Sequence, residues 1–393
     1  MGKSIKIINL SKLNYEKDNW KHTVEFTNEI REFERDIFLK IISDRLSAED
    51  IKTIETPSII YPQEKSVLAV HWHPEFIPID LIKKRIHNTF PSFKNELIIP
   101  TQHNVVLNYN DYYGVEIDCF SKEFNRKVQL LLHFKNYDPE KAVTLNSIIE
   151  HTFKYRSKQL FELIHFITSP SMEDKFKIAI KETESDDLIV AFLKYHTSKL
   201  DQLIQTYDSK IPVWAIQNKL LRNYIDELRF FYDEKTIHRT QLLFSAVKRM
   251  VKKDFNVEYF YNTKDLIEEA RSANAGIVIP HPEQFWPILL ADYDVDGYEV
   301  WNPQSREFTN FLMNVLIKQN KTLQFKDKPL LLFMGDDTHM GEKIRALELQ
   351  DPEKAGREIG VQLGWEDPDV QKTLIASGFS KERIIDEYKS RLE

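Results

Sequence analysis

Apolar residues recur every three or four positions near the start of the chain, a spacing that predicts an amphipathic helix with one packing face. The members of this stripe are Phe26, Ile30, Phe33, Ile37 and Ile41. We therefore predict an N-terminal helical extension over residues 1–65.

The pattern changes at Ser66, where short apolar runs alternate with polar turns and with the helical pattern of Leu81–Ile86. Runs of this length and spacing predict strands that alternate with helices, as in an α/β domain. The runs are Val67–Val70, Leu97–Ile99, Val105–Leu107, Val115–Ile117 and Val128–Leu132, and later Gly276–Ile279, Gly297–Val300 and Pro329–Phe333.

Between these two groups of predicted strands, residues 139–255 have the spacing of helices. Ile149, Phe153, Leu160, Ile164 and Ile167 share one face, and similar patterns follow at Leu188–Ile204, Ile216–Phe231 and Leu242–Val251. We predict a helical insertion over 139–255 and a helical C-terminal tail over 346–393. A basic run at 248–253 fits a solvated helix face, with phosphate contact as the alternative.

Composition and charge narrow the function classes. Hydrophobic residues make up 42% of the 393 residues, and the formal charge of −7 excludes an overall basic field for binding nucleic acid. A local basic groove stays open. Cys119, the single cysteine, excludes an intramolecular disulfide and favours a reducing compartment. With no long apolar segment and no signal-peptide pattern, we expect a cytoplasmic protein with no membrane contact.

Six of the twelve histidines stand at or near the ends of apolar runs. Each one alone fits a polar residue where a strand meets its loop. His71 and His73 follow a predicted strand, and residues i and i+2 of an extended chain point to the same side. The six are His71, His73, His103, His133, His281 and His339.

Two acids join this set. Glu116 lies between Val115 and Ile117, where a carboxylate is costly to bury without a cation, and Asp337 follows the last run. In parallel α/β barrels the carboxyl ends of the strands converge on one mouth. Eight such residues exceed the four ligands of one zinc ion, so we predict two or three ions. Such a cluster suits phosphoester chemistry.

The order of these segments resembles the polymerase and histidinol phosphatase (PHP) superfamily. That family has His-x-His, Thr-Asp-His, Gly-Ile-Glu-Ile, a His-Ile-Leu-Gly-Tyr-like segment, Ala-His-Pro and Gly-Ser-Asp-Ala-His in this order. The matching segments here are His71-Trp72-His73, Thr101-Gln102-His103, Gly114-Val115-Glu116-Ile117, His133-Phe134-Lys135-Asn136-Tyr137, Pro280-His281-Pro282 and Gly335-Asp336-Asp337-Thr338-His339. Asp265–Ala270 and Gly297–Asn302 also resemble the family's segments.

The resemblance implies a distorted (β/α)7 TIM-like barrel built from residues 66–138 and 256–345. It also implies a cluster of manganese, iron or zinc ions and hydrolysis of phosphate esters by a metal-bridging hydroxide. The expected catalytic residues are Glu116, Asp337 and His281, the last as the proton donor to the leaving oxygen. The expected metal ligands are His71, His73, Glu75, His103, Glu116, His133, His281, Asp337 and His339.

Two positions depart from the family. Gln102 stands where the family usually has aspartate, which puts a proton-handling role there in doubt. A further ligand is expected shortly after His-x-His, and we choose Glu75 with Asp80 in reserve because neither keeps the usual spacing.

Three basic residues near the late motifs, Arg306, Lys343 and Arg345, are candidates to hold a substrate phosphate, with plain surface charges as the alternative. The expected partners are a phosphorylated small molecule or a nucleic acid. The 139–255 insertion is a candidate cap or binding site for a partner protein. Three alternatives stay open: a PHP-type nuclease, a catalytically decayed PHP-fold scaffold, and an amidohydrolase-type C–N hydrolase, which fits the late motifs less well.

Overall fold

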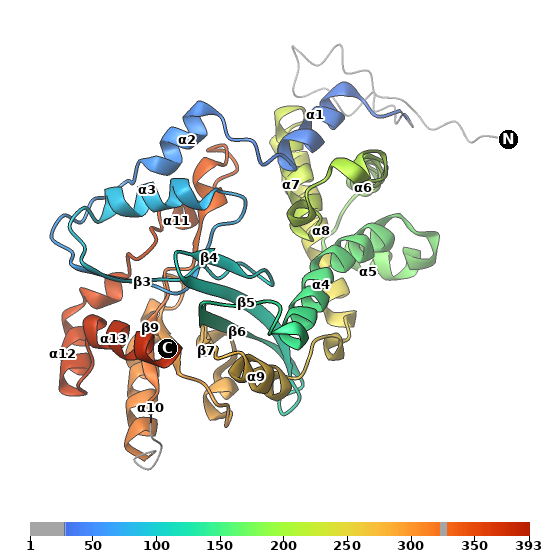
Figure 1. Cartoon of the computed structure of the whole chain (residues 1–393). Helices are drawn as coiled ribbons and strands as arrows, with labels where there is room; N and C mark the ends of the chain where they lie inside the picture. Colours follow the sequence, from blue (N-terminus) through green and yellow to red (C-terminus); the bar gives the residue numbers. More distant parts are fainter. Residues whose placement is uncertain (1–26, 28, 323–327) are drawn as a thin grey trace. The chain divides into compact units, whose positions relative to one another are not determined.

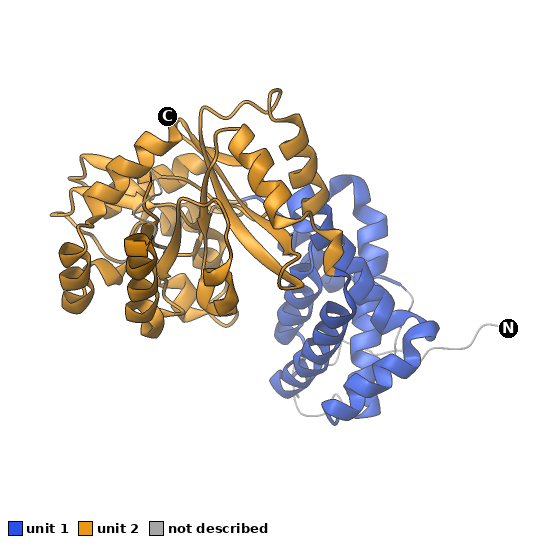
Figure 2. Ribbon diagram, turned by 90° about the horizontal axis from the view of Figure 1, so that it is seen from below, with its two compact units in different colours: residues 1–45, 154–256 blue, residues 46–153, 257–393 orange. Residues whose placement is uncertain are grey.

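The structure is a computed structural model that describes residues 27, 29–322 and 328–393 (Figure 1). Phe26, the first residue of the predicted N-terminal stripe, lies outside the described residues. The chain forms two compact units, each built from two segments (Figure 2). One combines residues 1–45 with 154–256, and the other combines 46–153 with 257–393.

The unit of 46–153 and 257–393 contains the strands, so the mixed α/β class is confirmed. One sheet has six strands in the order β4-β5-β6-β7-β8-β9, and two further parallel pairs join β1 to β3 and β2 to β10. The strands are β1 (Ser66–Ala69), β2 (Trp72–His73), β3 (Asn95–Ile98), β4 (Leu107–Tyr109), β5 (Tyr112–Ser121), β6 (Arg126–Lys135), β7 (Gly276–Ile279), β8 (Gly297–Trp301), β9 (Leu331–Met334) and β10 (Thr338–His339).

The larger sheet is mixed rather than all parallel. Strands β7, β8 and β9 are parallel, whereas β4, β5, β6 and β7 alternate in direction. Only residues 122–125 connect β5 to β6, and a parallel crossover needs about a dozen residues or more, so this connection forms a hairpin. The expected parallel alternation is wrong here. Regular ladders among the described residues do not close a ring, and the TIM-like barrel stays a prediction.

Short bridges nevertheless connect the small strand pairs to the sheet. Strand β10 follows β9 and pairs with β2, which aligns His339 with His73. A parallel bridge also joins His103, beyond the end of β3, to Glu116 in β5. These contacts bring the ends of β1, β3, β7 and β9 toward one region. A parallel barrel was expected because it brings strand ends together in this way.

Helices flank these strands. The last helix belongs to the core of this unit rather than to a separate tail, because Ile384, Ile385, Tyr388 and Leu392 are buried in the same cluster as the strands. Burying an Ile or Leu side chain contributes about 1.5–3 kcal/mol. The helices are α2 (Ala48–Glu55), α3 (Ile79–Thr89), the first part of α4 (Val143–Thr168), α9 (Thr263–Ser272), α10 (Thr309–Thr322), α11 (Pro352–Ala355), α12 (Pro368–Ala376) and α13 (Lys381–Leu392).

The other unit is helical throughout its described residues. Its helix α1 comes from the predicted N-terminal extension and contacts α6 and α7 of the predicted insertion, so these two segments share one core. Its helices are α1 (Glu32–Ile41), the second part of α4, α5 (Glu173–Glu182), α6 (Asp187–Tyr207), α7 (Lys219–Glu227) and α8 (Glu234–Asp254). No helix in the described residues of either unit combines the length and apolar character needed to cross a membrane.

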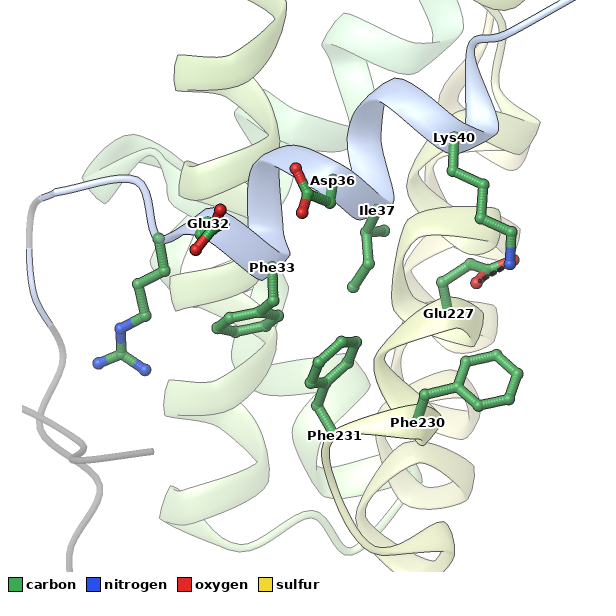
Figure 3. A pocket seen from close by; sticks show the side chains of 9 residues that line it. Glu32, Phe33, Asp36, Ile37, Lys40, Glu227, Phe230 and Phe231 are labelled. Atoms are coloured by element: carbon green, nitrogen blue, oxygen red, sulfur yellow. Dashed lines mark hydrogen bonds and ion pairs between the residues drawn. The ribbon is translucent and has the colours of Figure 1, made fainter. Parts of the chain in front are cut away.

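A groove of ≈ 700 Å³ lies on this helical unit (Figure 3). Phe33 from α1 faces Phe231, with their ring centroids 4.6 Å apart. An ion pair of 2.7 Å between Lys40 and Glu227 stands at its edge. The groove therefore has an apolar floor and a charged border.

Candidate metal centre

Seven side chains of the α/β unit meet in three overlapping groups that could hold metal ions. Within each group one ligand atom per residue lies within 4.8 Å of the others. The groups are His73, His103 and His339; His71, His73 and Asp337; and His71, Glu116 and His281. Because His71 and His73 each belong to two groups, the three groups form one continuous cluster.

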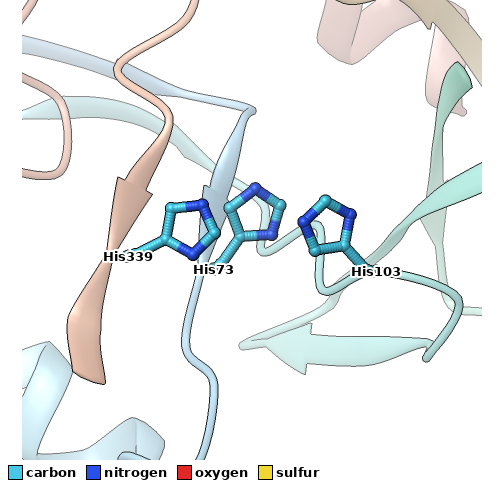
Figure 4. Close-up of side chains that lie close together, drawn as sticks. All are labelled: His73, His103 and His339. Carbon is cyan, nitrogen blue, oxygen red and sulfur yellow. The ribbon is translucent and has the colours of Figure 1, made fainter. Parts of the chain in front are cut away.

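The fold explains this convergence. His71 and His73 lie just beyond β1, His281 lies beyond β7, and Asp337 lies beyond β9. The register of β2 with β10 stacks the His73 ring on that of His339, with centroids 4.3 Å apart, and the His103 ring lies 4.4 Å away on its other side (Figure 4). Residues scattered over almost 270 positions thus meet at the ends of neighbouring strands.

Asp337 faces three of the imidazoles with a single oxygen. Its Oδ1 lies 3.3 Å from His73 Nε2, 3.5 Å from His339 Nε2 and 3.7 Å from His71 Nε2. The residue has a left-handed backbone with φ of 45°, an uncommon conformation for a residue other than glycine. This backbone aims the carboxylate into the cluster.

Glu116 is the second carboxylate of the cluster and also faces three imidazoles. Its Oε2 lies 2.5 Å from His103 Nδ1 and 3.7 Å from His73 Nε2, and its Oε1 lies 3.5 Å from His281 Nε2. His281 also has a left-handed backbone, with φ of 31°. Since His73 faces both carboxylates, the two halves share a ligand.

The donor set and its spacing fit divalent metal ions. Two ligands of a tetrahedral zinc ion, each at about 2.0–2.1 Å, are about 3.3–3.4 Å apart, close to several of these carboxylate–imidazole distances. His71 Nε2 and both ring nitrogens of His73 are buried without a hydrogen-bond partner. Buried polar atoms of this kind are normally satisfied, so the residues fit a bound cation. Mixed imidazole and carboxylate ligands suit zinc, iron or manganese.

The side chains of the cluster differ in their exposure. The side chains of His71, His73 and Glu116 are each 1% exposed, whereas that of Asp337 is 19% exposed. The side chains of His103, His281 and His339 are also partly exposed, at 14–17%. A small ligand can therefore reach the cluster at these four side chains.

Sequence reasoning missed Glu299 as a site residue. This buried carboxylate of β8 lies 2.6 Å from His71 Nδ1 and accepts a hydrogen bond of 3.0 Å from the His281 backbone N–H. A Cβ atom at position 335 would collide with the Glu299 carboxylate, so Gly335 makes room for it. The signal was present, because Glu299 stands in an apolar strand just as Glu116 does.

Glu75 orients a ligand candidate instead of joining a metal group. Its Oε1 lies 3.1 Å from His339 Nδ1, and its Oε2 accepts a hydrogen bond from the Gly341 N–H. Carboxylates commonly hold the second nitrogen of a metal-binding histidine in this way. Gln102 in turn accepts a 3.0 Å hydrogen bond from the Glu75 N–H, and the reserve candidate Asp80 is exposed in α3.

Neighbouring charges set the protonation of the cluster. Burial lowers the pKa of His71, but the carboxylates of Glu299, Asp337 and Glu116 together outweigh burial and raise this pKa to about 10. Burial together with His339 and His103 holds the pKa of His73 well below its usual value. Burial raises the pKa of Glu116, yet the facing imidazoles reverse this and hold it well below its usual value. A neutral His73 and an ionised Glu116 are metal-binding forms.

The structure does not bring His133 into the cluster. Because β6 runs antiparallel to β7, His133 pairs with Gly276 at the start of β7, whereas His281 follows the end of that strand. Both ring nitrogens are engaged, Nε2 with the Val70 carbonyl at 2.9 Å and Nδ1 with the Tyr388 hydroxyl at 2.8 Å. We therefore remove His133 from the expected ligand set.

The three basic residues expected to hold a substrate phosphate lie in different surroundings. Lys343 is buried and donates to the Ala355 and Arg357 carbonyls, so it stabilises the chain rather than facing a ligand. Arg345 pairs with Glu342 at 3.3 Å, and Arg306 is exposed. Arg357, which was not among the candidates, contacts Asp337 at 3.1 Å.

Comparison with protein-family models gives no match, and comparison with curated proteins gives none either. A similar solved structure is that of a "putative metal-dependent phosphoesterase" from Bifidobacterium adolescentis. It shares 15% sequence identity with a TM-score of 0.40, and the alignment covers 81% of this chain and 98% of the other. A likeness of this size assigns neither fold nor function to the chain.

Proposed function

We propose that this chain is a metal-dependent phosphoesterase. The observation that carries the proposal is the meeting of five imidazoles and two carboxylates in three overlapping groups, four of whose side chains are partly exposed. A set of this size exceeds one tetrahedral site and favours two or more neighbouring ions. Paired metal sites are typical of enzymes that displace oxygen at phosphorus.

Divalent manganese, iron or zinc ions held by these residues would supply positive charge that neutralises and polarises the phosphoryl group. The side chains have separable tasks in this proposal. Asp337 and Glu116 fix the positions of the imidazoles that they face. His281, partly exposed and facing Glu116 at 3.5 Å, delivers a proton to the leaving oxygen. Glu299 holds the backbone of His281 and the ring of His71 in place.

The proposed substrate is a phosphorylated small molecule or a nucleic acid. The test combines elemental analysis of protein purified without chelator with turnover of p-nitrophenyl phosphate and bis-p-nitrophenyl phosphate. We expect bound manganese, iron or zinc, and hydrolysis that a chelator abolishes and the metal restores. Turnover of the monoester would identify a phosphatase, and turnover of the diester a nuclease-like enzyme. Bound metal without turnover of either ester would contradict the proposal and favour a scaffold.

A further inference from the structure

Two arginines from distant parts of the chain flank one carboxylate oxygen. Glu353, on the short helix α11, places its Oε1 4.0 Å from Arg306 Nη2 and 4.0 Å from Arg357 Nη2. Arg306 begins the turn η9 (Arg306–Phe308), five residues after the end of β8. The loop after β8 and the segment after α11 therefore meet at this carboxylate.

Arg357 connects this arrangement to the metal cluster. Its Nη1 donates hydrogen bonds to the Asp337 carbonyl at 3.0 Å and to Asp337 Oδ2 at 3.1 Å, while Asp337 Oδ1 faces the imidazoles. The side chain is 5% exposed, and its Nε is buried without a hydrogen-bond partner. A guanidinium group beside the cluster thus retains unused donor capacity.

Buried charged groups hold the backbone at Arg357 in place. Its carbonyl accepts a hydrogen bond from Lys343, and the next residue, Glu358, pairs with Arg85 through both of its oxygens. Arg85 also donates to carbonyl groups at the end of α2. Such multiply bonded buried groups hold a side chain in one orientation.

Glu353 is held much more weakly. The separation of 4.0 Å from each arginine is too long for a hydrogen bond, and the side chains of Glu353 and Arg306 are 57% and 64% exposed. Exposed pairs of this kind contribute little to stability. A phosphate group offers several acceptor oxygens to the planar donors of an arginine, so it bonds better than this carboxylate does.

We propose that Arg306 and Arg357 together bind the phosphate group of the substrate, and that Glu353 is an internal counter-ion which the phosphate displaces. The pair is called the arginine clamp below. The proposal rests on the proposed function for the identity of the ligand. It names a phosphate-binding element that lies beside the metal ligands and includes neither Lys343 nor Arg345.

Phosphate binding to the full chain tests the clamp separately from catalysis. Isothermal titration calorimetry with inorganic phosphate would compare the unmodified protein with Glu353→Gln, and elemental analysis would accompany each variant. Removal of the competing charge is expected to tighten phosphate binding about three- to tenfold. The matched control is Glu307→Gln, which removes an exposed acid next to Arg306 that forms no ion pair in the described residues. It should leave phosphate binding unchanged.

Two further variants distinguish binding from structural support. Arg306→Ala should weaken phosphate binding at least about fivefold with unchanged metal content, because Arg306 contacts no ligand candidate. Arg357→Lys keeps the charge but removes the planar donor pair, and it should weaken phosphate binding more than Arg306→Ala does. In the double variant Arg306→Ala, Glu353→Gln, the gain from Glu353→Gln should shrink, because half of the clamp is missing.

The results separate the two proposals. Equal or weaker phosphate binding by Glu353→Gln, in protein with normal metal content and normal stability in urea, would overturn the clamp even if phosphate esters are hydrolysed. Tighter binding by Glu353→Gln, without turnover of any ester, would support the clamp and contradict the phosphoesterase. Failure of the unmodified protein to bind phosphate at all would overturn the clamp.

Discussion

Each compact unit has a histidine that is at most 1% exposed, and the surroundings of the two side chains are opposite. In the α/β unit, His71 faces Glu299 at 2.6 Å and Asp337 at 3.7 Å. In the helical unit, His196 on α6 is packed among aromatic rings, with Phe192 at 4.4 Å and Tyr232 at 5.3 Å between centroids. Neither ring nitrogen of His196 has a hydrogen-bond partner.

The pKa values of the two imidazoles are therefore shifted in opposite directions. Burial lowers the pKa of both, but carboxylates raise that of His71 to about 10, whereas the nearby cations Arg31 and Lys199 help to lower that of His196 to about 3. Of these two buried histidines, only the one that carboxylates face belongs to a candidate metal group. His196 belongs to no group of metal-binding side chains in the described residues.

The strongest test of the contrast between the two units replaces one buried carboxylate in each of them by an amide. Glu116→Gln removes a charge that faces three imidazoles, and it should lower metal affinity and phosphoester turnover by at least about 100-fold, since even residues behind the ligands cost 10–100-fold. The matched change is Glu34→Gln in the helical unit, where the acid is also buried but faces no metal group. Elemental analysis after dialysis and turnover of p-nitrophenyl phosphate provide the measurements.

Glu34→Gln should keep full metal content and turnover. If Glu116→Gln retains its metal, or if both variants lose it equally, the distinction between the two buried environments is wrong. The double variant Glu116→Gln, Asp337→Asn extends the test, because it removes both carboxylates that face the imidazoles.

A smaller effect is expected at Glu299, which acts through its neighbours. Glu299→Gln keeps the size of the side chain but cannot accept as strongly from His71 Nδ1 and the His281 backbone. Metal affinity should fall about 10- to 100-fold, as is usual for groups that orient a ligand. A competition titration against a metal-binding dye would measure it. An unchanged affinity would show that Glu299 serves folding alone.

The helical unit should reveal its buried histidine through the pH dependence of unfolding. The folded pKa of His196 is about 3 against an ordinary 6.5, so a proton binds the unfolded chain preferentially. The stabilisation is therefore complete above pH 6.5 and is lost as the pH falls toward 3. Between pH 7 and pH 5 this one residue should lower the free energy of unfolding by about 2 kcal/mol.

Urea denaturation at these two pH values, followed for the unmodified protein and for His196→Leu, isolates this contribution. The variant should lose about 2 kcal/mol less than the unmodified protein between pH 7 and pH 5. His238→Leu, a change at an exposed histidine of the same unit, is the control. Identical pH dependence in His196→Leu and in the unmodified protein would contradict the assigned environment.

Much of this organisation could be predicted from the pattern of residues. Apolar runs marked β1, β3, β5, β6, β7, β8 and β9, because buried strands need continuous apolar sequence. The run Val115–Ile117 covers only three of the ten residues of β5, and the run Val105–Leu107 overlaps β4 at Leu107 alone. Strands β2 and β10 were missed, since two residues give no periodicity. The direction of β6 was also missed, although the short 122–125 connection is typical of a hairpin.

Some residues of the candidate site could be predicted from the sequence, and others could not. Histidines and Asp337 at the ends of apolar runs, with Glu116 inside one, identified seven side chains that the structure brings together. Glu299 was overlooked, although it stands in an apolar strand just as Glu116 does. Arg357 could not be found, because no local pattern indicates that a segment after α11 reaches Asp337. Glu75 was expected to bind the metal directly, whereas its carboxylate faces Nδ1 of the ligand candidate His339.

The smallest predicted effect tests His133, where sequence and structure disagree most directly. His133→Gln should destabilise the fold by about 1 kcal/mol, because an amide can replace only part of the hydrogen bonding to Val70 and Tyr388. Metal content should remain unchanged, since the antiparallel register of β6 keeps His133 away from the groups around His71. Urea denaturation and elemental analysis of the same preparation give both values. Loss of metal with unchanged stability would restore His133 as a ligand and would contradict the antiparallel register of β6, whereas loss of stability with full metal content would show that this buried histidine outside the cluster serves the fold alone.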